Sequence, residues 1–509
     1  MSVLVTAAEM RAFDQQTIEG LGVPGAVLME TAGHAVAEQV RGLRPTSVLV
    51  VAGVGNNGGD GFVAARWLHG WELDVRVVLV GKSDRVRGDA ALHLAAARRA
   101  GVPLLELDEV AALDGAFGPA SVVVDALLGT GLVRPVEGLF AEVIARINDH
   151  AGVKVSVDVP SGLDSDRGVP VGACVRADHT VTFGFCKRGL VVAPGFTFAG
   201  QIQTVDIGIP AALARGCKTV LLDDGVLRPF SGALGPLGHK GTHGHLLVLA
   251  GSPGKSGAAA LAGRAALRCG AGLVTVASDA ATLAAMMAVS GSPELMTLAL
   301  MPKADAQLAS MLAALDGKRA LAIGPGLSGS VATGQLVGAL ITEALRRALP
   351  LVLDADGLNH LAATPAFLTD GATTNPRRAV VLTPHPGEAA RLLGRSTAEV
   401  QADRVECAQT LAVRYGAVVA LKGARTLVAA PDGRLAVCPA GNAGLGSGGT
   451  GDVLTGCIGA LLLAGSDAWQ AATAGVYLHG AAGDLVATTN GQRGLLASDV
   501  IEAMPRLLR

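Results

Sequence analysis

The residues best suited to chemistry lie in a glycine-rich segment near the C-terminal end of the chain. The segment 440–456, AGNAGLGSGGTGDVLTG, holds seven glycines and leads into an apolar stretch that predicts a helix. Backbone N–H groups of such a loop, at a helix N-terminus, can bind a phosphate or another oxyanion. Asp452 falls in the first turn of this helix, where its carboxylate can take a proton from a hydroxyl group during phosphoryl transfer. The alternative is an Asp that only stabilises the helix N-terminus, and a carboxylate beside an anion site favours the chemical role.

A second group of polar residues follows three predicted strands in the N-terminal half. These strand ends are the glycine-rich turn VAGVGNNGGDG (51–61), Asp125 with the loop GTGLVRP (129–135), and DVPSG (158–162). Ligands of open parallel sheets bind at the carboxyl ends of the strands, so three polar strand ends together predict one anion-binding site. Each end alone has a structural alternative, either a tight turn or a helix cap. The oxygen donors that would suit a hard cation there are Asn57, Asp125 and Ser161.

Other motifs in the C-terminal half of the chain carry less weight. His385 stands in a strand-to-helix turn before Gly387–Glu388, where a structural hydrogen bond and a ligand contact are equally expected. Asp354 and Asn359 are interpreted only as supporting residues. Gly254–Lys255–Ser256 resembles the end of a Walker phosphate loop, but Leu249 stands where that motif needs glycine, so we reject it.

The elements that must position the N-terminal residues follow the order of an α/β fold. The predicted strands cover 47–53, 74–81, 121–129, 153–162, 179–184 and 202–208. Apolar β-branched runs that alternate with helical segments predict a parallel sheet covered on both faces, as in a Rossmann-like three-layer αβα domain. A helix is predicted over 60–70, and another is expected to start at Thr6, which has capping-box spacing to Glu9.

A second alternating series follows residues 209 to about 240, which are rich in Gly and Pro and show no periodic apolar pattern. The predicted strands of this series cover 245–251, 272–278, 319–326, 350–357, 379–388 and 417–423. A hairpin turned at Pro431–Asp432–Gly433 is also predicted, and long helices are expected after Gly451. We therefore place the domain boundary within residues 209 to about 240.

The bulk composition excludes several classes of protein. A chain of 509 residues is too long for one core, and 50% apolar residues with 3% aromatics predict cores of Ala, Val and Leu. A net charge of −2 without a long basic run argues against nucleic acid and membrane as partners. The seven cysteines form no CxxC motif and no cluster with His, which disfavours disulfides and zinc. The N-terminus has no signal-peptide pattern and the apolar stretches are too short to span a bilayer, so we expect a cytoplasmic protein.

The N-terminal motifs together resemble the NAD(P)H-hydrate epimerase domain over about residues 1–213. The motifs are LMETAG (28–33), NNGGDG (56–61), DALLGTGL (125–132), DVPSGLD (158–164) and FCKRGL (185–190), in that order. The resemblance implies that the hydrate is held by Asn56, Asn57, Gly58, Gly59, Asp60, Gly129, Thr130, Gly131, Leu132, Val133, Arg134, Pro135 and Asp158. It also implies that Asp158 is the acid/base group. The implied ligands of a potassium ion are Asn57, Asp125 and Ser161. Thr31 stands where the family usually has Asn.

The C-terminal motifs resemble the ADP/ATP-dependent NAD(P)H-hydrate dehydratase domain of the ribokinase-like superfamily over about residues 225–509. HPGE (385–388) together with GSGGTGD (446–452) is the most specific part of this resemblance. It implies a ribokinase-like α/β domain whose contacts to the hydrate are Ala258, Gly326, His385 and Asp452. The implied contacts to the adenine nucleotide are Lys422, Gly423, Ala424, Arg425, Thr426 and Gly451. Lys255 and Ser256 replace an aromatic residue that the family often has.

The two resemblances together imply a bifunctional nicotinamide-repair enzyme, an isomerase joined to a lyase. The first activity would interconvert the R and S hydrates of NADH and NADPH. The second would return the S hydrate to NAD(P)H at the expense of ADP, with magnesium, and would release AMP and phosphate. Asp452 would activate the ring hydroxyl for phosphorylation. A homo-oligomer, a tetramer, is also expected.

Two alternatives are weighed against this reading. The first is a ribokinase-like small-alcohol kinase, because GSGGTGD alone permits one; the HPGE motif and the epimerase-like half argue against it. The second makes the N-terminal half a non-catalytic ligand-binding or oligomerisation module, which Asp158 and the NNGGD motif disfavour.

Overall fold

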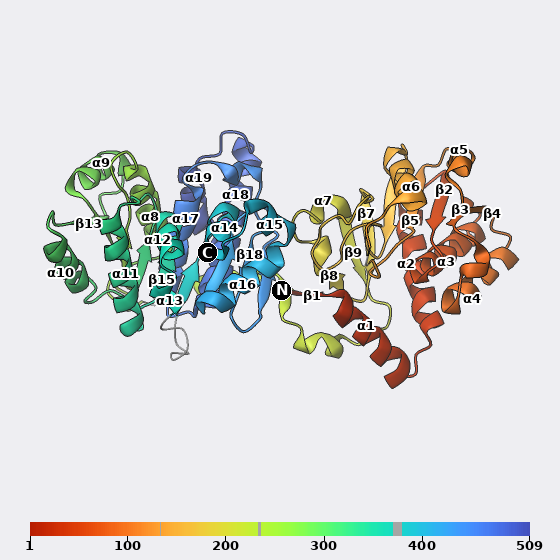
Figure 1. Ribbon diagram of the computed structural model, residues 1–509, viewed down its shortest axis with the longest axis horizontal. Coiled ribbons are helices and arrows are strands. Elements are labelled where there is room, and N and C mark those ends of the chain that lie inside the picture. The colour runs from red at the N-terminus through yellow and green to blue at the C-terminus, as the bar shows by residue number, and fades with distance from the viewer. Residues whose placement is uncertain (133, 233–235, 370–378) are drawn as a thin grey trace. The chain divides into compact units, whose positions relative to one another are not determined.

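The computed structural model describes residues 1–509 except 133, 233–235 and 370–378, and the chain divides into two compact units (Figure 1). One unit comprises Val3–Thr219, and the other comprises Val220–Arg509 together with Met1–Ser2. Each is an α/β unit built on a sheet whose central strands are parallel, so the predicted fold class is confirmed. No helix in the described part of the chain is long and apolar enough to span a membrane.

The N-terminal unit contains a parallel sheet with the strand order β4-β3-β2-β5-β6-β7-β9. Its strands are β2 (Ser47–Ala52), β3 (Asp74–Val80), β4 (Leu104–Leu107), β5 (Val122–Ala126), β6 (Val153–Val157), β7 (His179–Phe183) and β9 (Gln201–Val205). The chain builds outward from β2 in one direction and from β5 in the other. The topological switch point, where ligands bind in open α/β sheets, therefore lies between β2 and β5.

Helices cover both faces of this sheet because its strands present two apolar faces. Val48 and Val50 pack on one face against α2 (Gly25–Gly42), α3 (Asn56–Gly70) and α4 (Gly88–Arg99). Leu49 and Val51 pack on the other face against α6 (Gly138–Asp149). The predicted three-layer αβα arrangement is therefore confirmed. Shorter helical segments are Ser83–Arg85, Val110–Ala112, α5 (Leu113–Ala116), Arg188–Leu190, α7 (Phe196–Ala199) and Ala211–Gly216.

A short parallel strand pair brings the first helix of the chain close to the end of β7. β1 (Ser2–Val5) pairs with β8 (Cys186–Lys187), and Val5 lies opposite Lys187. α1 (Ala7–Gln15) begins directly after Thr6 with the predicted capping box to Glu9, which is confirmed. The helix continues as a π-helical turn over Gln16–Gly20, which is closed by the N–H of Leu21 donating to the carbonyl of Gln16 at 3.2 Å.

The sheet of the C-terminal unit has the strand order β13-β12-β11-β14-β15-β16-β17-β18-β19-β10. Its strands are β10 (Thr219–Leu221), β11 (His245–Leu249), β12 (Leu273–Ser278), β13 (Met296–Ala299), β14 (Ala320–Ile323), β15 (Leu351–Leu353), β16 (Val380–Leu382), β17 (Val418–Leu421), β18 (Leu427–Ala429) and β19 (Leu435–Val437). β11 to β17 are parallel, and β18 and β19 form the predicted hairpin. The switch point of this sheet lies between β11 and β14.

The helices of the C-terminal unit pack on this sheet, with one large core formed by α8, α17, α18 and α19 against Leu246 and Val248 of β11. The helices are α8 (Ser256–Arg268), α9 (Ala280–Ser290), α10 (Ala304–Ala314), α11 (Val331–Arg346), α12 (Ala355–Ala363), α13 (Ala366–Thr369), α14 (Pro386–Leu393), α15 (Thr397–Ala402), α16 (Arg404–Tyr415), α17 (Thr450–Leu463), α18 (Ala468–Asn490) and α19 (Ala497–Leu507). Helical turns at Asp224–Phe230 and Ala443–Gly446 are of the 3-10 type. The long helices predicted after Gly451 are thus confirmed.

The strands that the sequence did not predict are short. β4 and β13 end their sheets, and most of their side chains are exposed. Such strands lack the continuous apolar pattern that marked the central strands, because only part of their surface is buried. β10, three residues long, lies in the Gly- and Pro-rich segment 209 to about 240, for which no strand is predicted.

Candidate active sites

A cavity of about 960 Å³ lies in the N-terminal unit at the switch point of its sheet. Ten of the residues predicted to hold the hydrate line it: Asn56, Asn57, Asp60, Gly129, Thr130, Gly131, Leu132, Arg134, Pro135 and Asp158. Gly58 and Gly59 are instead buried inside α3, and Val133 lies outside the described residues. The volume is typical of a small-molecule site.

The glycines of NNGGDG begin a helix and do not form the expected loop. The sequence predicted a glycine-rich turn with a helix from Asp60, whereas α3 begins at Asn56. A Cβ on Gly58 would lie 1.9 Å from the carbonyl oxygen of Gly53, and one on Gly61 would lie 2.6 Å from the Cβ of Ala126. Glycine is thus required for close packing of the helix start against the strand ends. The free N–H groups of the first turn still favour an anion at this helix N-terminus.

Asp158 is held in the cavity by a strained backbone and a buried lysine. Its φ of 65° lies in the left-handed region, which non-glycine residues rarely adopt and which is enriched at functional sites. Lys187 Nζ donates to Asp158 Oδ1 at 2.5 Å and to the carbonyl of Phe183 at 2.8 Å, and Lys187 is 1% exposed. Thr182 Oγ1 donates to the same Oδ1 at 3.1 Å. Among the described residues these contacts fall on Oδ1, so Oδ2 remains for a ligand in the cavity.

Two further carboxyl groups face the same cavity. Burial raises the pKa of Asp14 to about 6, and the charge of Asp158 adds to this effect while Lys187 opposes it. Burial raises the pKa of Asp60 well above its ordinary value as well. Proton donors and a proton acceptor can therefore coexist in this cavity near neutral pH.

Lys187 and Asp14 were not predicted as site residues. A lysine in the short apolar motif FCKRGL was the available signal for Lys187. The available signal for Asp14 was its spacing: it is an acidic residue four positions from Met10 and four from Ile18, both of which line the cavity.

Two of the predicted cation ligands, Asp125 and Ser161, are hydrogen-bonded to each other below the strand ends. Asp125 is fully buried and accepts hydrogen bonds from Ser156 Oγ (2.8 Å), Ser161 N (2.9 Å) and Ser161 Oγ (2.5 Å). Burial raises its pKa, and only these neutral groups and the N–H of Leu127 oppose that rise. The third predicted ligand, Asn57, lines the cavity from the start of α3, and its Nδ2 is buried without a partner among the described residues. A buried carboxylate held only by neutral donors fits a cation bound by oxygens. The described residues contain no cluster of three or more His, Cys, Asp or Glu that could hold a metal ion.

A second cavity, of about 560 Å³, lies in the C-terminal unit at the carboxyl ends of β11, β14, β15 and β16. All four residues predicted to contact the hydrate line it, namely Ala258, Gly326, His385 and Asp452. Gly326 has a φ of 62°, and a Cβ there would lie 2.8 Å from the Cβ of Ala258. Glycine is therefore needed at position 326, because any side chain there would collide with Ala258 in the lining of the cavity.

Asp452 lies in the first turn of α17, as the sequence predicted. Gly449 precedes the helix with a φ of 92°, and the N–H groups of residues 450–452 have no acceptor within the helix. Burial raises the pKa of Asp452 to about 7; the charges of Asp354 and Glu388 act in the same direction and that of Lys422 opposes them. A carboxyl group with this pKa is well matched to proton transfer at neutral pH.

Lys422 anchors a cluster of buried charges behind Asp452. Its Nζ lies 2.7 Å from Asp354 Oδ1 and 3.8 Å from Glu388 Oε2. Burial alone would lower the pKa of Lys422, but the carboxylates of Asp354, Glu388 and Asp452 outweigh it and raise that pKa. Asp354, interpreted from the sequence as a supporting residue only, is 1% exposed and also accepts from Thr455 Oγ1 at 2.7 Å.

The residues predicted to contact the nucleotide adjoin this cluster but do not line the cavity. A Cβ on Gly451 would lie 3.4 Å from Lys422 Nζ, so the two lie side by side. In the segment Gly423–Thr426, the hydroxyl of Thr426 donates to the carbonyl of Gly423 at 2.9 Å. Arg404, which the sequence did not single out, donates to the carbonyls of Ala424 (2.6 Å) and Lys422 (3.3 Å). This buried guanidinium fixes the shape of the segment from behind.

His385 caps a helix and also faces the cavity. Its Nδ1 accepts from the N–H of Gly387 at 3.0 Å and of Glu388 at 3.4 Å, at the start of α14. Burial lowers its pKa, as do the charges of Lys422 and Arg391. The neutral form of the imidazole, which accepts these two hydrogen bonds, is therefore favoured.

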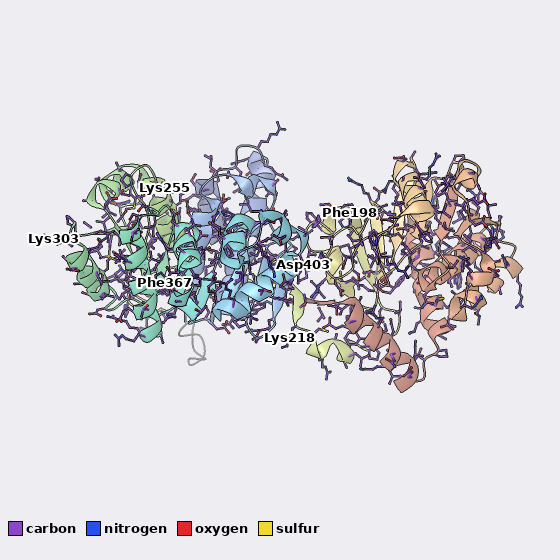
Figure 2. The ribbon with its side chains drawn as sticks, viewed as in Figure 1. Phe198, Lys218, Lys255, Lys303, Phe367 and Asp403 are labelled. Atoms are coloured by element: carbon purple, nitrogen blue, oxygen red, sulfur yellow. The ribbon has the colours of Figure 1, made fainter. Side chains whose placement is uncertain are left out.

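Lys255, labelled in Figure 2, lines the second cavity before α8. Its Nζ lies 3.3 Å from Asp356 Oδ2 and 3.4 Å from the carbonyl of Leu327. The ammonium group is thus placed where the resemblance led us to expect an aromatic ring.

Comparison with known proteins agrees with the two-part organisation. A family model described as NAD(P)H-hydrate dehydratase matches residues 246–506, and one described as YjeF-related protein N-terminus matches residues 25–189. The bifunctional NAD(P)H-hydrate repair enzyme Nnr of Moorella thermoacetica is 42% identical, over 99% of this chain and 96% of that protein.

Two solved structures resemble part of the chain. A ribokinase-like superfamily protein from Enterococcus faecalis superimposes with a TM-score of 0.50 at 23% identity, over 57% of this chain and 95% of that one, and shows the fold. The ADP/ATP-dependent NAD(P)H-hydrate dehydratase of Bacillus subtilis, co-crystallised with ATP and Mg²⁺, gives a TM-score of 0.47 at 33% identity, over 56% and 96%.

Proposed function

The chain belongs to the family of bifunctional NAD(P)H-hydrate repair enzymes, and from this premise we propose how its two cavities divide the work. The protein epimerises hydrated NADH and NADPH and dehydrates the S epimer to the intact dinucleotide. We assign epimerisation to residues 1–213 and dehydration to residues 225–509. ADP is the phosphoryl donor in this proposal, and AMP and phosphate are the other products.

The dehydratase assignment rests on the carboxyl group of Asp452. This group lies in the first turn of α17, and its pKa is about 7. Asp452 takes the proton of the ring hydroxyl while that oxygen attacks the β-phosphorus of ADP and AMP departs. The ring C–O bond of the phosphate ester then breaks, the neighbouring carbon loses a proton, and the ring double bond is restored. Phosphate is a far better leaving group than hydroxide, which is why the nucleotide is consumed.

The nucleotide is assigned to Lys422, Gly423, Ala424, Arg425, Thr426 and Gly451. Magnesium bound to its phosphates would neutralise part of their charge. The proximity of Gly451 to Lys422 Nζ supports one continuous nucleotide surface that ends at Asp452. The free N–H groups at the start of α17 would bind the transferred phosphoryl group.

We assign epimerisation to the cavity of the N-terminal unit because Asp158 and Lys187 are paired there. The left-handed backbone of Asp158 and its bond to a buried ammonium support a role for its carboxylate as acid/base group. Potassium is proposed at Asn57, Asp125 and Ser161, where it would neutralise the buried carboxylate and keep the strand end fixed. A homo-oligomer, in the form of a tetramer, is also proposed.

The test uses separated R and S hydrates of NADH with ADP, and follows recovery of the reduced-nicotinamide absorbance. The unaltered protein should repair both epimers, and Asp452→Asn should repair neither. Asp158→Asn should repair S at the normal rate and leave R to its slow spontaneous epimerisation. Absence of recovery by the unaltered protein with either ADP or ATP would overturn the proposal. Phosphorylation of a small alcohol in its place would favour the kinase.

A further inference from the structure

Asp14 lines the epimerase cavity. It lies on α1, and the cavity-lining residues Met10 and Ile18 are four positions to either side of it. Asp14 is half-buried beside the buried side chain of Met10, and the hydration that it loses there destabilises the folded protein. Retention of such a group in a cavity is typical of a catalytic carboxyl group.

The fold holds Asp14 close to Asp158 and Lys187 by two separate contacts. β1 pairs with β8 so that Val5 lies opposite Lys187, and α1 follows one residue after β1. Phe13, next to Asp14, packs edge-on against Phe185 with ring centroids 5.6 Å apart. The helix then continues as a π-helical turn, a rare irregularity that is frequent at functional sites.

Epimerisation of the hydrate needs two proton transfers. Water adds to an enamine at the carbon next to nitrogen, so the hydroxyl of the hydrate lies on the carbon beside the ring nitrogen. Inversion at that carbon requires a proton for the departing hydroxyl and a base for the water that attacks the opposite face. Asp158, which is paired with Lys187, can serve only one face at a time.

We propose that Asp14 is the second acid/base residue of the epimerase cavity, acting with Asp158 on opposite faces of the hydroxyl-bearing carbon. This inference rests on the proposed epimerase function. Asp14 gives its proton to the hydroxyl; the C–O bond breaks, and the nitrogen lone pair forms a C=N bond as water leaves. A second water attacks from the other face, Asp158 takes its proton, and the C=N electrons return to nitrogen. The reverse epimerisation starts with Asp158 protonated and Asp14 ionised.

The pKa of Asp14 supports this role. Burial places it at about 6, so a useful fraction of Asp14 is protonated near neutral pH. The other charged and titratable groups that line the cavity are Arg11, Asp60, Asp89, Arg134, Glu137, Asp158 and Lys187. Lys187 already donates to Asp158 and to the carbonyl of Phe183, so its ammonium group holds Asp158 in place, and we assign proton exchange on the second face to Asp14.

The experiment measures equilibration of separated R and S hydrates by the full chain without nucleotide, by chromatography. Asp14→Asn should lower kcat about 10²–10³-fold with KM changed less than about threefold, because a general acid is removed and the cavity is kept. Asp14→Glu should recover at least a tenth of the rate. Glu19→Gln, an exposed change in the adjoining turn, is the matched control and should be unchanged. Dehydration of the S hydrate with ADP by each variant shows that the protein is folded.

Three results would overturn the inference. If the unaltered chain does not accelerate equilibration, the proposed epimerase function fails and the role of Asp14 fails with it. If Asp158→Asn is inactive but Asp14→Asn stays within about twofold of the unaltered rate, only the role of Asp14 is wrong. In ¹⁸O-water each epimerisation should place one solvent oxygen in the hydroxyl, and equilibration with the original oxygen retained would contradict the proposed step.

Discussion

Replacing Asp452 by Asn should slow dehydration by about 10³-fold and at the same time stabilise the protein at pH 8. Burial raises the pKa of Asp452 from 3.8 to about 7, so this carboxyl group holds its proton more tightly in the folded state than in the unfolded state. Below pH 3.8 Asp452 is protonated in both the folded and the unfolded state, so its ionisation does not change the free energy of unfolding. Above pH 7 Asp452 is ionised in both states, and the folded state is destabilised by the full free energy of burying the charged carboxylate.

The size of this cost follows from the interval between the two pKa values. Each pH unit corresponds to about 1.4 kcal/mol, so ionised Asp452 destabilises the folded protein by at most about 4 kcal/mol at pH 8. Relaxation and solvent reduce this figure, and we expect a gain of about 1–3 kcal/mol for the neutral, isosteric Asn. For a unit of this size, 1 kcal/mol raises Tm by about 2–4 °C. At pH 5 most of the gain should be lost.

The assay combines scanning calorimetry at pH 8 and pH 5 with the dehydration rate of the S hydrate. Dehydration should fall by about 10³-fold, since the group that accepts the hydroxyl proton is lost. Asp356→Asn, a change at the rim of the same cavity, is the matched control and should not raise Tm. A variant that lost both activity and stability would refute the reasoning, because Asp452 would then be a structural residue. So would a variant that kept its activity.

The remaining predictions concern other parts of both sites. The dehydration rate should rise about tenfold between pH 6 and the plateau above pH 8, because only ionised Asp452 accepts a proton and its pKa is about 7; a flat pH–rate profile would contradict this. Lys187→Met should reduce epimerisation at least about 10²-fold and leave dehydration of the S hydrate unchanged, and equal losses of both rates would exclude a local role. Gly326→Ala should raise KM for the hydrate about tenfold or more, since its Cβ would lie 2.8 Å from that of Ala258, while Gly329→Ala, with open space around its Cβ, should leave KM unchanged. Potassium chloride should raise the Tm of the unaltered protein above its value in tetramethylammonium chloride, and the same rise in Asp125→Asn would argue against the proposed cation site.

The central strands of both sheets were predictable because a strand that is buried on both faces has a continuous run of apolar residues. The run VLVVA in β2 is apolar and fully buried, whereas LLEL in β4 is exposed over half of its length and resembles a loop. The start of α3 was misplaced for a different reason. Glycine serves both flexible turns and close packing, and the sequence alone does not say which of the two Gly58 serves.

The two sites differ in how much of each was predictable. Asp452 and the glycines before it are neighbours in sequence, so their chemistry could be inferred from one short segment. Asp14 and Lys187 are brought together by the pairing of β1 with β8, which joins parts of the chain more than 170 residues apart. Asp354 likewise meets Lys422 only through the order of strands. Long-range packing of this kind has no local signature, which is why these residues were missed or given a minor role.

The buried glycines at the start of α3 affect how much of this protein a cell would retain after a mutation. A Cβ at position 58 would collide with the backbone of Gly53, so a substitution there acts on folding before it acts on turnover. Chaperones and proteases remove poorly folded chains, and abundance falls steeply with a few kcal/mol of lost stability. Because both activities share one polypeptide, degradation that begins in the epimerase half would also deplete the dehydratase. Both damaged forms of the dinucleotide pool would then accumulate from a single lesion.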